Sequence, residues 1–176
     1  LQDERLSQSG VYGMAFSPSH GLLVSSGRQL YRVGDNDLTL LASSVGRGIY
    51  AIHAAGPRTY VFAWDGAYEY SAKGLLTLDM PGTGTLGAVA CDGTGGFLVM
   101  REGQGLFQYD GKTWTGIGTG AIPPHGATSL LRDPDGSVWI GYNGSRIVHW
   151  RSGEARIFGS KERLDIGTVS ALEKVG

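Results

Sequence analysis

A pattern of apolar residues and turn residues repeats four times along the chain, with a period of about 40 residues. In each copy, aromatic or branched residues alternate with mixed residues in a short run that ends at Val33, Tyr70, Tyr109 or Trp150. The steps between these positions are 37, 39 and 41 residues. Such a period predicts a repeat architecture, in which each unit buries its apolar surfaces against neighbouring units.

The copy within residues 128–151 is the clearest one. Its apolar residues follow a period of two in three short runs, as antiparallel strands require. Asp-Pro-Asp-Gly at 133–136 separates the first two runs, and this composition favours a tight reversal of the chain. Asn-Gly at 143–144 and Ser-Gly at 152–153 predict two further hairpins. Four antiparallel strands within about 40 residues form one blade of a β-propeller.

The same signals divide the whole chain into blades. We expect an all-β fold of four-stranded antiparallel blades, with blades at approximately 11–42, 49–79, 88–118 and 128–159. Residues 169–172 repeat the pattern of 128–131 at a step of 41, which predicts the inner strand of a further blade at 169–173. Four blades and one inner strand leave open sheet edges, which propellers normally avoid by closing into a ring. We therefore expect that the chain forms an incomplete ring, and that remaining blades of a longer chain, or a second copy, would complete it.

The composition favours many tight turns and no long helix. The chain has 30 glycines, six prolines and only 18% charged residues, and no window shows a convincing helical period. The net charge is −1 with scattered charges, so we expect neither nucleic acid nor an anionic membrane as a partner. No signal peptide and no apolar run of spanning length occurs, so no direct membrane insertion is expected. The single cysteine, Cys91, lies in an apolar run and is expected to behave as a small buried hydrophobe.

One stretch resembles a known repeat family. Asp-x-Asp-Gly-x-Val-Trp-Ile-Gly at residues 133–141, followed by an aliphatic-aromatic strand and a Ser-Gly turn, is similar to the two-component regulator propeller repeat. The match is specific in the fourth blade, moderate in the third and weak in the first two. Repeats of that family build the extracytoplasmic ligand-sensing part of bacterial hybrid histidine kinases and related regulators. The resemblance therefore implies a periplasmic or extracytoplasmic sensor domain in signal transduction, with no catalysis of its own.

Motifs for catalysis, metals and cofactors are weak. Gly-Thr-Gly-Thr-Leu-Gly at 82–87 spells the dinucleotide motif, but a strand rather than a helix is expected after it, so we expect no cofactor. The four histidines lack the spacing of zinc ligands, which argues against a metal site. No Gly-x-Ser-x-Gly elbow and no Ser, His and Asp grouping occurs, so we assign no catalytic residue.

A ligand site, if present, is expected on one face of the blades. The connections between blades and the hairpins between second and third strands share the face around the channel mouth, where binding residues gather over a rigid scaffold. The candidate residues on these segments are Arg47, Tyr50, Trp64, Arg101, His125, Tyr142 and Arg146. Aromatic rings and guanidinium groups together suit an unknown small molecule, either a carbohydrate or a carboxylate.

Three functions stay open at this point. The favoured one is a non-catalytic sensing or binding module of a two-component regulatory protein. A propeller enzyme of the streptogramin-lyase type is the main alternative, and it would need a clustered metal site and a general base on the channel face. His125 is the only histidine that we place there. A purely structural protein-interaction propeller is the third.

Overall fold

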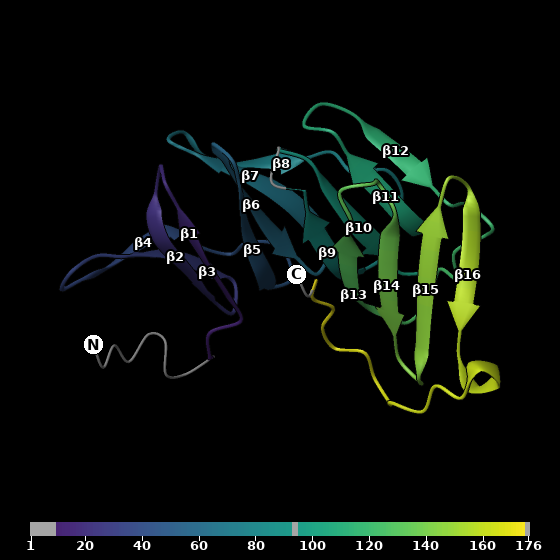
Figure 1. Cartoon of the computed structure of the whole chain (residues 1–176). Coiled ribbons are helices and arrows are strands. Elements are labelled where there is room, and N and C mark those ends of the chain that lie inside the picture. The colour runs from purple at the N-terminus through teal and green to yellow at the C-terminus, as the bar shows by residue number, and fades with distance from the viewer. Residues whose placement is uncertain (1–9, 93–94, 175–176) are drawn as a thin grey trace. The chain divides into compact units, whose positions relative to one another are not determined.

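The computed structural model describes residues 10–92 and 95–174, and within them it is an all-β protein (Figure 1). Its sixteen strands form four antiparallel sheets of four strands each, and the strands of each sheet pair in their order along the chain. This order is that of propeller blades, and the prediction of four-stranded antiparallel blades is confirmed. The only helical element of the described residues is a short 3-10 turn, Ser160–Glu162.

The bounds of the strands follow the turn residues. Blade one comprises β1 (Gly13–Ser17), β2 (Gly21–Ser26), β3 (Gln29–Val33) and β4 (Leu38–Ala42). Blade two comprises β5 (Ile49–Ala55), β6 (Arg58–Ala63), β7 (Gly66–Ser71) and β8 (Gly74–Leu78). Blade three comprises β9 (Leu86–Cys91), β10 (Phe97–Arg101), β11 (Gly105–Tyr109) and β12 (Trp114–Ile117). Blade four comprises β13 (Ala127–Arg132), β14 (Val138–Tyr142), β15 (Arg146–Arg151) and β16 (Glu154–Phe158).

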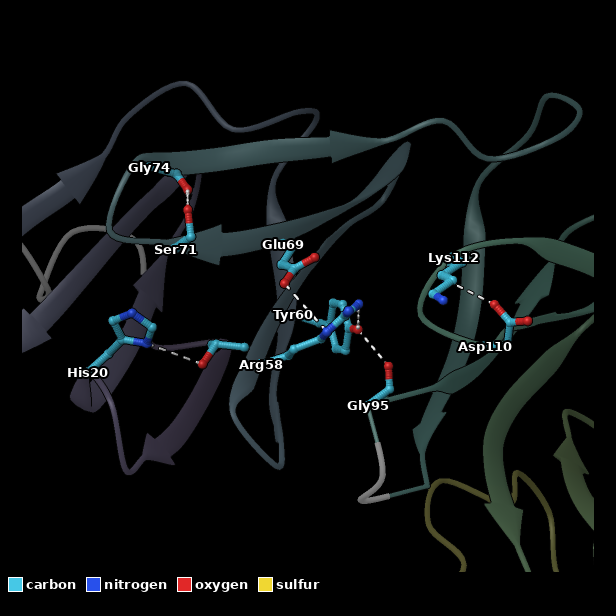
Figure 2. Close-up of polar contacts among 10 residues, drawn as sticks. His20, Arg58, Tyr60, Glu69, Ser71, Gly74, Gly95, Asp110 and Lys112 are labelled. Carbon is cyan, nitrogen blue, oxygen red and sulfur yellow. Dashed lines mark hydrogen bonds and ion pairs between the residues drawn. The ribbon is translucent and has the colours of Figure 1, made fainter.

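The turns between strands use the chemistry that the sequence suggests. Gly136, Gly144 and Gly153 have positive φ angles of 84°, 74° and 92°, which glycine adopts without strain. Between β11 and β12, the Asp110 carboxylate accepts the backbone N–H groups of Thr113 and Lys112 at 2.7 and 2.8 Å. Figure 2 shows the contact with Lys112. These hydrogen bonds favour the charged carboxylate and hold the pKa of Asp110 below its ordinary value.

The chain divides into two compact units. Of the described residues, the first unit contains 10–81 and 95, and therefore blades one and two. The second unit contains 82–92 and 96–174, and therefore blades three and four.

In the first unit, an apolar core lies between the two blades. Its buried members are Leu23, Leu30, Val45, Ile49, Ile52, Val61 and Ala63. The inner strands β1 and β5 approach closely, and a Cβ on Gly13 would lie only 3.2 Å from backbone atoms of Ala51. Glycine at position 13 therefore allows this packing without a shift of the neighbouring backbone.

The second unit is built in the same way. Its core includes Leu98, Met100, Leu106, Leu130, Ile140, Tyr142 and Val148, which come from blades three and four. On the inner strands, a Cβ on Gly87 would lie 2.9 Å from the carbonyl oxygen of Ala127. Both units thus combine alternating apolar residues with a glycine at the close approach of two inner strands.

The segment at which the sequence predicts a further inner strand lies beside blade four. The N–H of Val169 donates to the Tyr142 carbonyl at 3.1 Å. The hydroxyls of Thr128 and Ser129 donate to the Val169 carbonyl at 2.7 and 2.8 Å. Residues 164–174 nevertheless have no regular secondary structure. Strand ladders need a paired neighbour, and no other strand of the described residues pairs with 169–172.

Blade one has a row of side chains like the row through which blade two packs on blade one. This row consists of Met14, Val24 and Tyr31, which pair across β1, β2 and β3. It corresponds in register to Ile52, Val61 and Tyr68 of blade two, which pack on blade one. Among the described residues, however, this row is not fully covered, since Met14 is 66% exposed and Phe16, on the same strand, is 70% exposed.

The difference in exposure between Met14 and Ile52 can be tested in solution. We expect Met14→Lys to change the free energy of unfolding by less than about 0.5 kcal/mol, because the side chain is solvated. Ile52→Lys should cost more than about 3 kcal/mol, because it places a charge in the buried core. Urea denaturation followed by tryptophan fluorescence measures both. An equal loss of stability in the two variants would mean that the Met14 face is covered.

Candidate functional site

The structure places the seven predicted residues in two groups, one in each unit. Arg47, Tyr50 and Trp64 belong to the first unit. Arg101, His125, Tyr142 and Arg146 belong to the second. The residues of each group are spread over three kinds of position: the connection that precedes an inner strand, the end of a second strand, and the strands next to these two places.

In the first unit, backbone hydrogen bonds hold the connection between the blades, residues 43–48, against two hairpins. The N–H of Ile49 donates to the Gly27 carbonyl at 2.8 Å, and the N–H of Val45 donates to the Arg28 carbonyl at 2.9 Å. The N–H of Trp64 donates to the Gly48 carbonyl at 3.0 Å. The connection is therefore fixed to the β2–β3 hairpin of blade one and to the β6–β7 hairpin of blade two.

Tyr50 and Trp64 stack on each other. Their ring centroids are 4.6 Å apart and their planes differ by 23°. Tyr50 lies at a register shift of β5 between Ile49 and Ala51, and such bulges redirect a side chain. Its hydroxyl is buried without a hydrogen-bond partner among the described residues, and this burial raises the pKa of Tyr50. Trp64 is 44% exposed, so it presents a supported aromatic surface to solvent.

A small cavity of about 220 Å³ lies beside this stack, and we call it the first-unit groove. It is lined by Tyr12, Gly27, Arg28, Arg47, Gly48, Ile49 and Trp64. Arg47 and Trp64 are predicted from the sequence, whereas Tyr12 and Arg28 are not. Arg28 lies in the β2–β3 hairpin, and this position between a second and a third strand is a signal that could have predicted it. Tyr12 directly precedes β1, and nothing in its local sequence separates it from a strand residue.

The lining of the first-unit groove carries two guanidinium groups and no carboxylate. The Arg28 guanidinium donates to the Ser44 carbonyl at 3.2 Å. The Arg47 side chain has no ion pair or hydrogen bond with another described residue, whereas its backbone N–H donates to the Asp65 carboxylate at 2.8 Å. Neither guanidinium has a carboxylate partner among the described residues. The groove can therefore attract an anion, and its aromatic rings can stack on a flat group.

In the second unit, the predicted residues mostly make internal contacts. Glu102 accepts from the Gly126 N–H at 3.1 Å, and its carboxylate lies 3.0 Å from Nδ1 of His125. The Arg146 guanidinium lies 4.4 Å from the centre of the Tyr142 ring and donates to the His125 carbonyl at 3.2 Å. These contacts tie the connection before β13 to the hairpins of blades three and four.

Tyr142 and Arg101 are also held by their surroundings. The Tyr142 hydroxyl donates to the Pro123 carbonyl at 2.8 Å, and burial raises the pKa of Tyr142 to about 12. Nε of Arg101 donates to the Gly84 carbonyl at 3.3 Å. Arg101 is only 6% exposed, and burial lowers its pKa. Both side chains thus stabilise the loops around them, and Arg101 presents little surface to a ligand.

A wider cavity of about 660 Å³ lies at the outer part of blade four. Its lining combines Arg146, Arg163 and Asp165 with the apolar Ile157 and Leu164. Charges of both signs share this lining, so its electrostatic preference is less marked than that of the first-unit groove.

The first unit also contains a histidine bonded to hydroxyl groups. Nδ1 of His20 lies 3.3 Å from the Ser17 hydroxyl and 3.4 Å from the Thr59 hydroxyl. Ser17 and Thr59 are buried, and no carboxylate contacts His20 among the described residues. This geometry links the end of β1 to the start of β6 and leaves no hydroxyl accessible to a substrate.

Tyr60 and Arg58 order another part of the first unit (Figure 2). The Tyr60 hydroxyl donates to the Gly95 carbonyl at 2.6 Å, and the Arg58 guanidinium donates to the Tyr60 hydroxyl at 3.4 Å. Arg58 also lies 3.8 Å from the Glu69 carboxylate. These groups are satisfied by one another and offer no free charge.

No group of three or more His, Cys, Asp or Glu side chains is placed to hold a metal ion in residues 10–92 and 95–174. Within the same ranges, no helix has the length and apolar character needed to cross a membrane.

The reactivity of the Cys91 thiol tests whether this side chain is protected in the folded protein. Burial, together with the neighbouring Asp92 carboxylate, raises the pKa of Cys91 to about 12. Because the thiolate is the reactive form, we expect iodoacetamide at about pH 8 to modify the folded protein at least a hundredfold more slowly than the urea-unfolded protein. Mass spectrometry measures the two rates. Comparable rates would mean that Cys91 is accessible as a thiolate in the folded state.

No family model and no curated protein matches the sequence. Solved structures match its fold. The extracellular domain of BT4673 from B. thetaiotaomicron, described as part of a hybrid two-component system, gives a TM-score of 0.69 at 18% identity. The match covers 92% of this chain and 24% of that one. The corresponding domain of BT3049, from the same organism, gives 0.65 at 13% identity, covering 87% and 25%.

A further match is the structure of YCF48 bound to D1 peptide, with a TM-score of 0.66 and 16% identity, over 92% of this chain and 56% of that one. The chain thus spans about a quarter of the length of the two bacterial domains. At these identities the likeness establishes the propeller fold, and it agrees with the resemblance of residues 133–141 to the two-component regulator repeat.

Proposed function

We propose that this chain is part of a sensory β-propeller that binds a small molecule outside the cytoplasm and performs no catalysis itself. The observation that carries the proposal is the first-unit groove. There, beside the exposed Trp64 ring, Arg28 and Arg47 have no carboxylate partner within residues 10–92 and 95–174. Unpaired cations beside a supported aromatic ring are typical of a binding site, because both groups gain from a ligand what the protein does not supply.

The sensory role and the location have separate support. The bacterial structures with this fold are extracellular domains described as parts of two-component systems. The repeat motif of blade four resembles the family from which such sensors are built. A small carbohydrate or carboxylate is the proposed ligand class, since rings and guanidinium groups meet at the groove.

A peptide ligand is a second candidate, favoured by one observation. YCF48 has the same fold and was solved bound to D1 peptide. A peptide would present a carboxylate at its C-terminus, so it could use the same guanidinium groups.

Ligand-induced thermal stabilisation tests the proposal. We expect at least one compound from a panel of sugars, carboxylates and short peptides to raise the melting temperature by roughly 5–10 °C at a hundredfold excess over its Kd. Trp64→Ala and Arg47→Ala should abolish this shift, because they remove the ring surface and the free cation.

Leu76→Ala is the matched control, because Leu76 is also an exposed side chain of blade two but does not line the groove. It should keep the full shift. The proposal is wrong if no compound of the panel stabilises the protein, or if the control loses the shift as completely as the groove variants do.

A further inference from the structure

We propose that the first-unit groove selects a single flat aromatic ring that carries a carboxylate, in preference to a sugar. This inference rests on the proposed function, because it assumes that the groove binds a small molecule. It adds the chemical class of the ligand, which follows from the walls, the floor, the charges and the size of the groove.

Two aromatic side chains from different blades line the groove. Tyr12 directly precedes β1 of blade one and is 62% exposed, while Trp64 follows β6 of blade two. The Trp64 ring is supported on one side by Tyr50, which fixes its orientation before any ligand arrives. Flat rings stack on such surfaces without needing hydrogen bonds.

The floor of the groove is made of backbone. Gly27 and Gly48 line it, and the Ile49 N–H bonds to the Gly27 carbonyl beneath. A Cβ on Gly48 would lie 3.5 Å from the Trp64 ring and 3.7 Å from the Gly27 carbonyl. Gly48 also has a φ of 122°, which side chains rarely allow. Glycine at this position therefore keeps open the space beside the Trp64 ring.

The charges select an anionic group. Arg28 and Arg47 both line the groove, and the nearby Asp65 carboxylate accepts the Arg47 backbone N–H. A guanidinium can bind a carboxylate through two parallel hydrogen bonds, which an ammonium cannot do. A carboxylate on the ligand would supply the anionic partner that the described residues do not give to either guanidinium group.

The lining does not suit a sugar. None of its seven residues has an amide or a carboxylate in its side chain, so the hydroxyl groups of a sugar would find few side-chain acceptors. Hydroxyls that lose water without gaining a partner weaken binding. An aromatic ring has no such requirement. The volume of about 220 Å³ is below the roughly 300–1,000 Å³ of pockets for drug-sized ligands, which favours one ring with its carboxylate.

The test compares four probes by NMR titration of the whole chain. The probes are 4-hydroxybenzoate, its neutral amide 4-hydroxybenzamide, the non-aromatic cyclohexanecarboxylate, and D-glucuronate. We expect saturable binding of 4-hydroxybenzoate that shifts the Trp64 indole signal. The amide and the non-aromatic acid should each bind at least tenfold more weakly, because one lacks the charge and the other lacks the flat ring.

Variants locate the binding. Trp64→Leu and Arg47→Gln should each weaken 4-hydroxybenzoate binding at least tenfold. Arg32→Gln is the matched control for charge, since Arg32 is an exposed arginine of blade one outside the groove, and it should bind normally. Unchanged binding in Trp64→Leu would overturn the inference, because the ligand would then occupy another site.

The outcomes also separate this inference from the proposed function. If D-glucuronate binds at least as tightly as 4-hydroxybenzoate, and Trp64→Leu weakens it, the aromatic selectivity is wrong while the sensory ligand site stands. If neither these probes nor any compound of the wider panel binds, both proposals fail.

Discussion

One backbone hydrogen bond recurs at the junction of blade and loop, and the candidate sites depend on it. In blades two, three and four, the residue that follows the second strand donates its N–H to the residue just before the inner strand. The pairs are Trp64 to Gly48 at 3.0 Å, Glu102 to Thr85 at 2.9 Å, and Asn143 to Gly126 at 2.9 Å. This bond places the side chain of the hairpin residue beside the connection that leads into the inner strand. It does so equally for tryptophan, glutamate and asparagine.

The inner strands add a second constraint at the same level. In these three blades, the register between the first and second strands shifts near the start of the inner strand. A shift of this kind turns one residue out of the regular alternation. Tyr50 uses it to stack on Trp64, whereas Thr128 uses it to bond to the Val169 carbonyl. The backbone geometry at this shift recurs in the three blades, but the side chains placed there differ. The same scaffold therefore presents different chemical groups.

The sequence predicts the strands and turns of the blades better than it predicts which loop side chains are free to bind a ligand. The blades follow from short-range signals, such as Asn-Gly at 143–144 and the alternation of apolar residues, and these signals act through local geometry. Whether a loop residue is free depends on distant partners. Arg101 was a candidate by position, yet the Gly84 carbonyl engages it and it is buried. Arg28 was missed although its hairpin is equivalent to that of Trp64.

The two units show what decides between a structural loop and a binding loop. In the second unit, Glu102 follows the second strand at the position that corresponds to Trp64, and its carboxylate engages His125 and the Gly126 N–H. The His125 ring and the Gly126 N–H are therefore paired with a carboxylate of the protein. In the first unit, a tryptophan stands at that position, and neither Arg28 nor Arg47 has a carboxylate partner in the part of the chain that the structure describes. Because an unpaired cation beside an exposed ring gains more from a ligand than a paired one does, the first-unit groove has the stronger physical basis for recognition.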